Sequence, residues 1–315
     1  MKRTLCMVLA VAAVAAAWAK ETKVLIIGNS FSVSVMRNWP QLAKASGSEL
    51  KAASMYIGGC SFQRHWENVE KATDLTFKPY DIWISDAEGV KRFKSNIPQM
   101  LASDKWDFVT IQQASHAAWD PETYHPYADK LIAKIKELAP QAEIVIQQTW
   151  AYCNLDKRIQ PGGAWKFDQT GQYERTRDAY ISLAKQYKFR MIPTGLAVQK
   201  FRQSLPVTLV YPTHEQLASC KKPETPDLGG EIVGRFSWKK PKDGKGEEKL
   251  SQDSIHLNAS GEYLQALVWQ AFFFGTDVTK TTYIPAYAGG KERASLMQSC
   301  ASEAVKEAAT SFNFR

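Results

Sequence analysis

A serine near one end of the chain and an aspartate–histidine pair near the other have the residue types of a catalytic triad. Ser30 follows a short apolar run and the turn residues Gly28 and Asn29, and Asp253 lies three residues before His256. A serine hydroxyl is a poor nucleophile until a neighbouring base takes its proton, and a carboxylate can orient the imidazole that acts as this base. Together the three residues indicate a serine-type hydrolase.

The position of His256 suits a neutral base. Asn258 is a good N-cap for a helix predicted over residues 259–274, which Gly275 would end. The amino end of a helix carries partial positive charge, which disfavours imidazolium. We therefore expect His256 to accept a proton from the serine.

The elements that must position these residues alternate between strands and helices. Apolar stretches predict five strands, at residues 23–27, 50–57, 106–111, 143–148 and 189–193. Amphipathic stretches predict helices between them, at residues 33–45, 62–71, 126–138 and 173–187, and weaker signals predict an edge strand at 80–84 and a short helix at 97–102. This alternation indicates an α/β fold, a three-layer α/β/α sandwich around a central, mainly parallel five-stranded sheet. Ser30 would lie at the carboxyl edge of that sheet, where such folds bind ligands.

The regular pattern stops between residues 205 and 252. Lys, Pro and Gly are frequent over residues 221–248, around a hairpin predicted at 230–238. We interpret this stretch as a surface insertion, with a lid over the site as the alternative. The main domain would span residues 20–275, and residues 276–315 would form an extension whose one helix, at 294–309, packs on the outside.

The first nineteen residues have the pattern of a signal peptide. Lys2 and Arg3 precede an apolar stretch, and Ala17-Trp18-Ala19 is a typical cleavage site. The apolar stretch is shorter than the roughly 20 residues that a membrane helix needs. We expect an exported protein, periplasmic or extracellular, without membrane insertion.

The charge distribution and the residue patterns argue against nucleic acid as a partner and against a bound metal or cofactor. The formal net charge is +8, and it falls by two without Lys2 and Arg3. This excess is spread along the chain, so we predict no nucleic-acid partner; it favours solubility or, alternatively, a mild preference for acidic glycans. No His, Cys or Asp pattern indicates a metal or cofactor.

Four cysteines lie outside the predicted signal peptide. They allow three disulfide pairings, or free thiols, among Cys60, Cys153, Cys220 and Cys300.

Three blocks of the sequence resemble the SGNH (GDSL-like) hydrolase superfamily of esterases and acetylesterases. Residues 28–32 (Gly-Asn-Ser-Phe-Ser) are similar to its first block, with Asn29 where Asp is commoner. Residues 58–59 (Gly-Gly) are similar to the second-block glycine, and residues 253–256 match the final Asp-x-x-His block. The resemblance spans residues 23 to about 275. It implies a flavodoxin-like SGNH fold, with Ser30 as nucleophile, His256 as base and Asp253 orienting the base.

The resemblance also implies an oxyanion hole. The first two donors would be the backbone N–H groups of Ser30 and Gly59. The family's usual third donor is the asparagine of a Gly-x-Asn-Asp block, but here the third strand runs into Gln-Gln-Ala-Ser-His. A gapless overlay places His116 at the asparagine position, whereas amide chemistry favours Gln112 or Gln113. We predict a glutamine, with Gln112 ahead of Gln113.

The activity implied is that of a carboxylic ester hydrolase. Export and family analogy favour acylated carbohydrate as substrate, with small O-acyl groups such as acetyl removed. Trp150 and Tyr152 follow the fourth strand and are candidates for a sugar-stacking surface, with aromatic packing as the alternative. Two other functions remain open: an arylesterase or lipase acting on apolar acyl esters, and a non-catalytic glycan-binding protein that keeps the fold.

Overall fold

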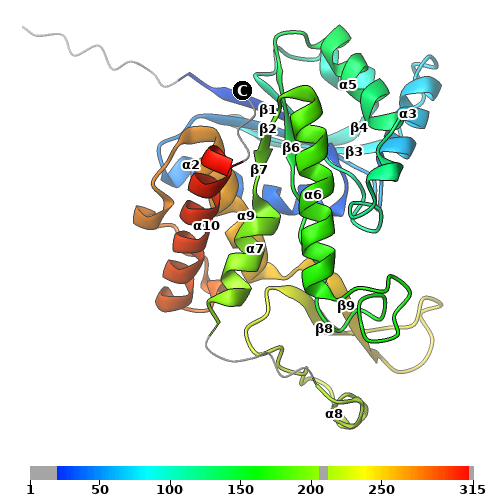
Figure 1. Cartoon of the computed structure of the whole chain (residues 1–315), viewed down its shortest axis with the longest axis vertical. Helices are drawn as coiled ribbons and strands as arrows, with labels where there is room; N and C mark the ends of the chain where they lie inside the picture. The colour runs from blue at the N-terminus through cyan, green and yellow to red at the C-terminus, as the bar shows by residue number, and fades with distance from the viewer. Residues whose placement is uncertain (1–19, 206–211, 312–315) are drawn as a thin grey trace, which may run out of the picture.

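A seven-stranded sheet in the order β4-β3-β2-β1-β5-β6-β7 forms the centre of the molecule (Figure 1). The computed structural model describes residues 20–205 and 212–311, so the predicted signal peptide lies outside the described residues. Five strands are parallel: β1 (Thr22–Gly28), β2 (Leu50–Tyr56), β5 (Phe108–Ile111), β6 (Glu143–Gln147) and β7 (Arg190–Ile192). Numbered among themselves, these five have the order 2-1-3-4-5, which is the flavodoxin-like order. The predicted α/β class and parallel five-stranded core are confirmed.

Residues 24–27 of strand β1 are all apolar because both faces of this strand are buried. Val24 and Ile26 are buried in one hydrophobic cluster, and Leu25 and Ile27 in the other. Successive side chains of a strand point to opposite faces, so a central strand covered on both sides needs apolar residues throughout.

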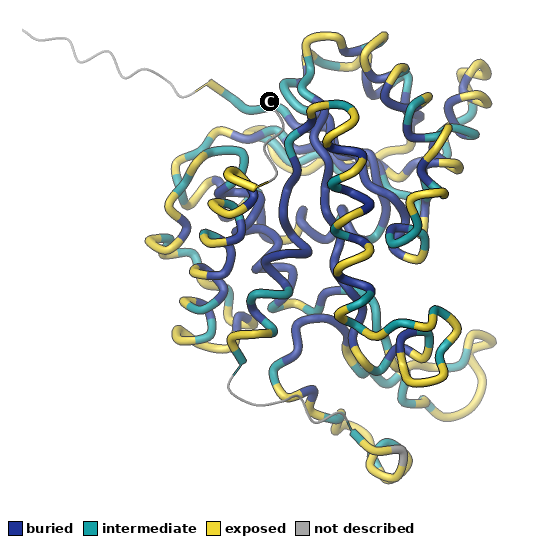
Figure 2. The backbone as a smooth tube through the Cα atoms, in the orientation of Figure 1, coloured by how far each residue is buried: buried dark blue, intermediate teal, exposed yellow. Residues whose placement is uncertain are grey.

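Helices cover both faces of the sheet (Figure 2). One layer contains α1 (Ser30–Val33), η1 (Ser34–Arg37), α2 (Trp39–Ala45), α7 (Thr194–Gln203) and α9 (Ala259–Phe274). The other contains α3 (Phe62–Lys71), α4 (Ile97–Ala102), α5 (Tyr127–Leu138) and α6 (Gln169–Tyr187). Shorter helices are η2 (Pro121–Thr123), α8 (His214–Ser219), η3 (Val278–Lys280) and η4 (Ala286–Ala288). The predicted three-layer sandwich is therefore confirmed.

The sheet has two strands beyond its parallel five-stranded core. β3 (Tyr80–Asp86) pairs antiparallel with β2, and β4 (Gly89–Ser95) pairs antiparallel with β3. The predicted edge strand at residues 80–84 is therefore an inner strand, and β4 is the true edge. Residues 89–94 are all exposed, and half of them are Lys or Arg. A strand with no buried face has no apolar alternation to reveal it, and charge is how natural edge strands avoid further pairing.

The insertion supplies a second, two-stranded sheet. β8 (Val233–Lys239) pairs antiparallel with β9 (Lys249–Leu257). The predicted hairpin at residues 230–238 is wrong, because this stretch forms only one strand and its partner is the segment that contains His256. The part of the insertion at residues 206–211 lies outside the described residues. Figure 1 shows β8 and β9 below the carboxyl ends of the parallel strands.

Helix α9 is buried along most of its length. Residues 261–271 are all buried, and α10 (Lys291–Ser311) packs on α7 and α9 from outside. The buried face of α10 contains the small residues Ala294, Ala301 and Ala304, which let the two helices approach closely. The C-terminal extension therefore completes the cover of a core helix. In residues 20–205 and 212–311, no helix is long and apolar enough to cross a membrane.

Candidate active site

The nucleophile turn is built from short-range hydrogen bonds at the end of β1. Asn29 is the N-cap of α1; its Oδ1 accepts from Phe31 N at 3.0 Å, and its backbone N–H donates to Ser32 Oγ at 3.1 Å. A Cβ atom on Gly28 would lie 2.3 Å from Ser32 Oγ, so the turn needs glycine there. Ser30 is thereby the first residue of the helix.

Asn29 also links the turns that follow three neighbouring strands. Its Nδ2 donates to Cys60 O at 3.0 Å, and its Oδ1 accepts from Gln112 Nε2 at 2.6 Å. Cys60 follows β2 and Gln112 follows β5. The family that the sequence resembles more often has aspartate at this position. An ionised aspartate could not donate to Cys60 O. The amide explains the sequence difference noted at residue 29.

Ser30, His256 and Asp253 lie together in hydrogen-bond contact. Ser30 Oγ is 2.8 Å from His256 Nε2, and His256 Nδ1 is 3.0 Å from Asp253 Oδ2. An ionised carboxylate only accepts hydrogen bonds, so Nδ1 carries the proton and Nε2 accepts from the serine hydroxyl. This is the arrangement in which imidazole takes the proton of an attacking serine.

Asp253 is ionised throughout the neutral pH range. Burial by itself would raise the pKa of its carboxyl. Hydrogen bonds from the His256 ring, His256 N and Ile255 N outweigh burial and bring the pKa to about 2. The negative charge needed to stabilise an imidazolium is therefore always present.

Buried aromatic rings pack against the triad on its core side. The Phe31 ring lies 5.5 Å from the His256 ring and stacks on Trp150 at 4.2 Å. Trp150 and Tyr152 are 1% and 0% exposed, and Trp150 Nε1 donates to Ile255 O at 2.9 Å. The prediction that these two side chains stack on a sugar is wrong, because their rings are already packed in the core.

The two backbone donors predicted for the oxyanion hole lie at neighbouring strand ends. Gly28 is paired with Tyr56 in register, so the turns with Ser30 and Gly59 leave the same edge of the sheet. Gly59 has φ of +59°, where side chains are disfavoured, and it is exposed. Within the described ranges, neither Ser30 N nor Gly59 N donates a hydrogen bond to another protein group. Their role as donors stays a prediction.

The third-donor candidates lie in different surroundings. Gln113 Nε2 donates to Thr123 O at 2.9 Å and to Thr123 Oγ1 at 3.1 Å, so both its amide hydrogens are used and the prediction for Gln113 is wrong. His116 is exposed in a separate hollow beside Trp119. Its ring is half-buried all the same, and this partial burial, together with the Arg158 charge, lowers the pKa of His116. Gln112 is buried, and only its bond to Asn29 uses an amide hydrogen in the described part of the chain.

Replacing Gln112 should therefore slow turnover. We expect Gln112→Ala to lower kcat by about 10²-fold with a smaller effect on KM, because the amide holds Asn29, the N-cap of the nucleophile turn; donation by Gln112 to the oxyanion stays a prediction. Steady-state kinetics on a nitrophenyl acetate measure this effect. Gln113→Ala is the comparison, and it should mainly lower the unfolding temperature. A wild-type kcat in Gln112→Ala would exclude both roles for Gln112.

A cleft of about 520 Å³ opens over the triad. Ser30 and His256 line it, as does Glu262 from the first turn of α9. Burial raises the pKa of Glu262, partly opposed by Arg37, whose Nη1 donates to Glu262 Oε1 at 2.8 Å. The sequence does not indicate Glu262 or the arginines that line this cleft, because these residues belong to no motif and are far apart in the chain.

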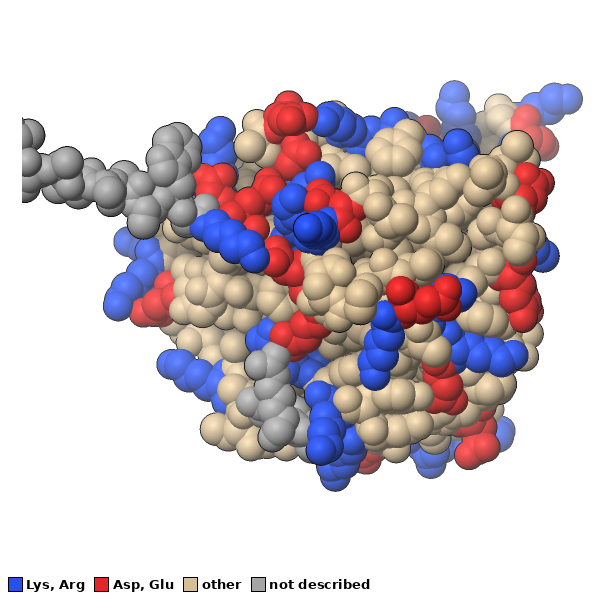
Figure 3. Space-filling model, turned by 90° about the horizontal axis from the view of Figure 1, so that it is seen from above, with Lys and Arg blue, Asp and Glu red and all other residues tan. Residues whose placement is uncertain are grey.

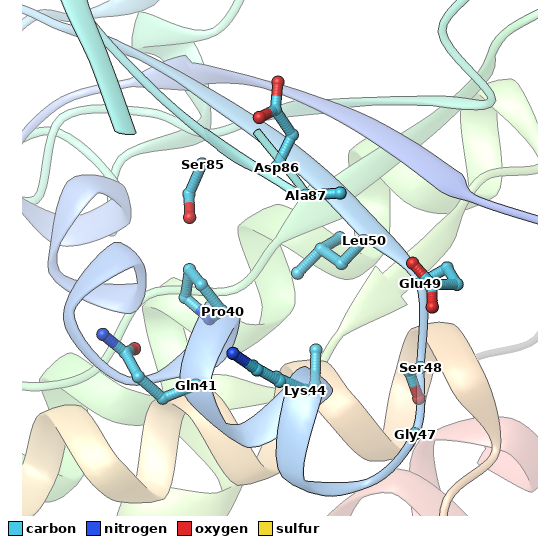
Figure 4. A pocket seen from close by; sticks show the side chains of 11 residues that line it. Pro40, Gln41, Lys44, Gly47, Ser48, Glu49, Leu50, Ser85, Asp86 and Ala87 are labelled. Carbon is cyan, nitrogen blue, oxygen red and sulfur yellow. The ribbon is translucent and has the colours of Figure 1, made fainter. Parts of the chain in front are cut away.

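A second cleft, of about 410 Å³, lies at the amino end of β2, beside its first residue (Figure 4). Ser30 lies at the other end of the parallel strands, where they have their carboxyl ends. Lys44, Glu49 and Asp86 are among its side chains, and none of the described residues that line it is a histidine or a cysteine. It therefore lacks a base of the kind that activates Ser30.

The structure also bears on metals and disulfides. In the described segments, no group of three or more His, Cys, Asp or Glu side chains could hold a metal ion. Among the described residues, no disulfide joins the four cysteines Cys60, Cys153, Cys220 and Cys300. None of the three pairings that the sequence allows among them is therefore formed.

Comparison with known proteins gives a family and a fold. The model of a family described as a domain of unknown function, DUF4886, matches residues 23–206. A DUF4886 family protein from Bacteroides uniformis has a crystal structure with 24% identity and a TM-score of 0.71, covering 91% of this chain and 95% of that one. This likeness concerns the fold.

Other solved structures are less similar. A candidate SGNH hydrolase from Slackia heliotrinireducens has 18% identity and a TM-score of 0.46, covering 79% of this chain and 97% of that one. A GDSL-like lipase from Bacteroides thetaiotaomicron has 13% identity and a TM-score of 0.35, covering 79% and 86%. No curated protein matches the chain. Since the family match covers more than half of the sequence, the chain belongs to the DUF4886 family.

Proposed function

We propose that this protein is an exported SGNH-type serine esterase that removes small O-acyl groups, most simply acetyl, from carbohydrate. The observation that carries the proposal is the position of the His256 ring, 2.8 Å from Ser30 Oγ on one side and 3.0 Å from Asp253 Oδ2 on the other. The export part of the proposal rests on the signal-like pattern of residues 1–19.

The geometry supports an acyl-enzyme mechanism. Ser30 Oγ attacks the ester carbonyl while His256 Nε2 takes its proton, and Asp253 stabilises the imidazolium. The backbone N–H groups of Ser30 and Gly59 would donate to the oxyanion. His256 then returns the proton to the leaving alcohol, and the same base activates the water that releases the acyl group.

The character of the cleft favours a small acyl group over a long one. Its lining includes the charged side chains of Arg37, Arg92, Arg235 and Glu262. A long acyl chain gains about 0.8 kcal/mol for each CH₂ group that it buries in an apolar site. Where charged side chains line the site, the chain gains less. This favours the esterase over the lipase alternative.

Acyl length is the direct measurement. We expect kcat/KM for 4-nitrophenyl acetate to exceed that for 4-nitrophenyl octanoate by at least about tenfold, after correction for the intrinsic reactivity of each ester. Equal or better turnover of the octanoate would instead support a lipase.

Catalysis itself is tested by covalent labelling. A fluorophosphonate probe should label the wild-type protein and not Ser30→Ala, and the wild-type protein should release acetate from acetylated glycans. No labelling, together with measurable glycan binding, would favour the non-catalytic alternative.

A further inference from the structure

Three arginines converge on the cleft that contains the nucleophile. Arg37 comes from η1, Arg92 from the edge strand β4, and Arg235 from β8 of the hairpin. They line the same cleft as Ser30 and His256. Because the three belong to separate elements, only the fold brings them together.

Two of these arginines have acidic neighbours. Arg37 forms an ion pair with Glu262 at 2.8 Å, and Arg235 lies directly across the hairpin from Asp253, with 3.5 Å between Nη2 and Oδ2. Their charges are thus partly balanced within the protein.

Arg92 is different. In the part of the chain that the structure describes, Arg92 has no carboxylate partner. Its guanidinium carbon lies 4.1 Å from the centre of the Trp83 ring, which is its register partner on β3. An arginine stacked on an indole is held in place by the ring face, and its N–H edge stays available for a ligand.

The local charge balance is positive. Three arginines face two carboxylates, and one of these carboxylates, Asp253, is already engaged by His256. Elsewhere the charges are mixed: on the face turned away from the hairpin, Figure 3 shows Lys and Arg interspersed with Asp and Glu. The cleft that contains the nucleophile therefore also contains an uncompensated cation, which attracts an anion.

We infer that the ester substrate carries an anionic group close to the acylated hydroxyl, and that Arg92, held on Trp83, binds this group. The inference rests on the proposed esterase function and narrows its substrate to anionic carbohydrate. A carboxylate, a sulfate and a phosphate share the geometry that a guanidinium recognises through two parallel hydrogen bonds. A neutral sugar would leave the Arg92 charge without a partner.

The test compares esters that differ only in charge. Monoacetylated methyl glucuronoside is compared with its neutral uronamide, each as the equilibrated mixture of acetyl positions, and acetate release gives kcat/KM. We expect at least about tenfold preference for the uronate, weakened by high salt. Monoacetylated methyl glucoside 6-sulfate and 6-phosphate show which anion is preferred. Preference for any of the three supports the inference, and preference for none overturns it.

Variants on one strand locate the effect. Arg92→Gln should bring the ratio of anionic to neutral turnover close to one, and Arg92→Lys should keep part of it. Lys91→Gln removes the same charge from the neighbouring residue, whose side chain points to the other face of β4, and should leave the ratio unchanged. Equal losses in Arg92→Gln and Lys91→Gln would overturn a specific role for Arg92.

Binding separates this inference from the proposed function. Calorimetry on Ser30→Ala measures affinity for the uronate and the uronamide without turnover, and the uronate should bind at least about tenfold more tightly. If the wild-type protein hydrolyses neutral esters as well as the uronate, the sulfate and the phosphate, the anion site is wrong and the esterase stands. If it hydrolyses neither and is not labelled by a fluorophosphonate, the esterase is wrong, and equal binding of the two compounds would overturn the anion site as well.

Discussion

Ser30→Ala is expected to lower kcat for acetyl esters by at least about 10³-fold, because it removes the nucleophile that the His256 base activates. The fold should survive, since no hydrogen bond of Ser30 Oγ other than that to His256 is made in the described residues. Steady-state kinetics measure the loss, and circular dichroism and the thermal midpoint check the fold.

A serine away from the site provides the control. Ser103 is the C-cap of α4, where its Oγ donates to Met100 O at 2.8 Å, and Ser103→Ala should have near wild-type activity. If Ser30→Ala keeps activity within tenfold of the wild-type protein, Ser30 is not the nucleophile.

Asp253→Asn should be nearly as damaging, with a loss in kcat on the order of 10⁴-fold and a small change in KM. The asparagine NH₂ group can donate to His256 Nδ1, which favours the tautomer with its proton on Nε2. That tautomer cannot accept from Ser30, so the base is lost while the side chain keeps its shape. The stabilising negative charge disappears as well.

The structure of Asp253→Asn should change little. The remaining oxygen can still accept from Ile255 N and His256 N, as Asp253 Oδ1 does at 3.1 Å from each. Asp107→Asn, at the amino end of β5, is the comparison and should retain activity. An Asp253→Asn variant with more than a tenth of wild-type kcat would show that His256 is oriented by another group.

The triad and the helix after it could be predicted because each depends on residue type in a short segment. Asn258 and Gly275 define a helix whose observed bounds, Ala259–Phe274, agree with the prediction. Hydrogen-bonding side chains at N-caps and glycine after the last turn are local requirements of any helix.

The errors come from features that only tertiary packing decides. Trp150 follows β6 at the active-site edge, as predicted, but position after a strand does not fix side-chain direction, and its ring turns into the core against Phe31. Gln113 was the second candidate for the third oxyanion donor, whereas buried backbone N–H groups of Phe62 and Ala114 need its Oε1 as acceptor. Arg92 was not foreseen, because its strand has no buried face to mark it.

The pairing of β9 with β8 has a consequence for the order of synthesis. The nucleophile and its base are 226 residues apart in sequence, and the base reaches the site only on the second strand of the hairpin. A chain that emerges from its amino end presents Ser30 early, but no base exists until that strand has been made and has folded against the sheet. Under the proposed mechanism the nascent protein is catalytically silent, and activity begins as a late event of its maturation.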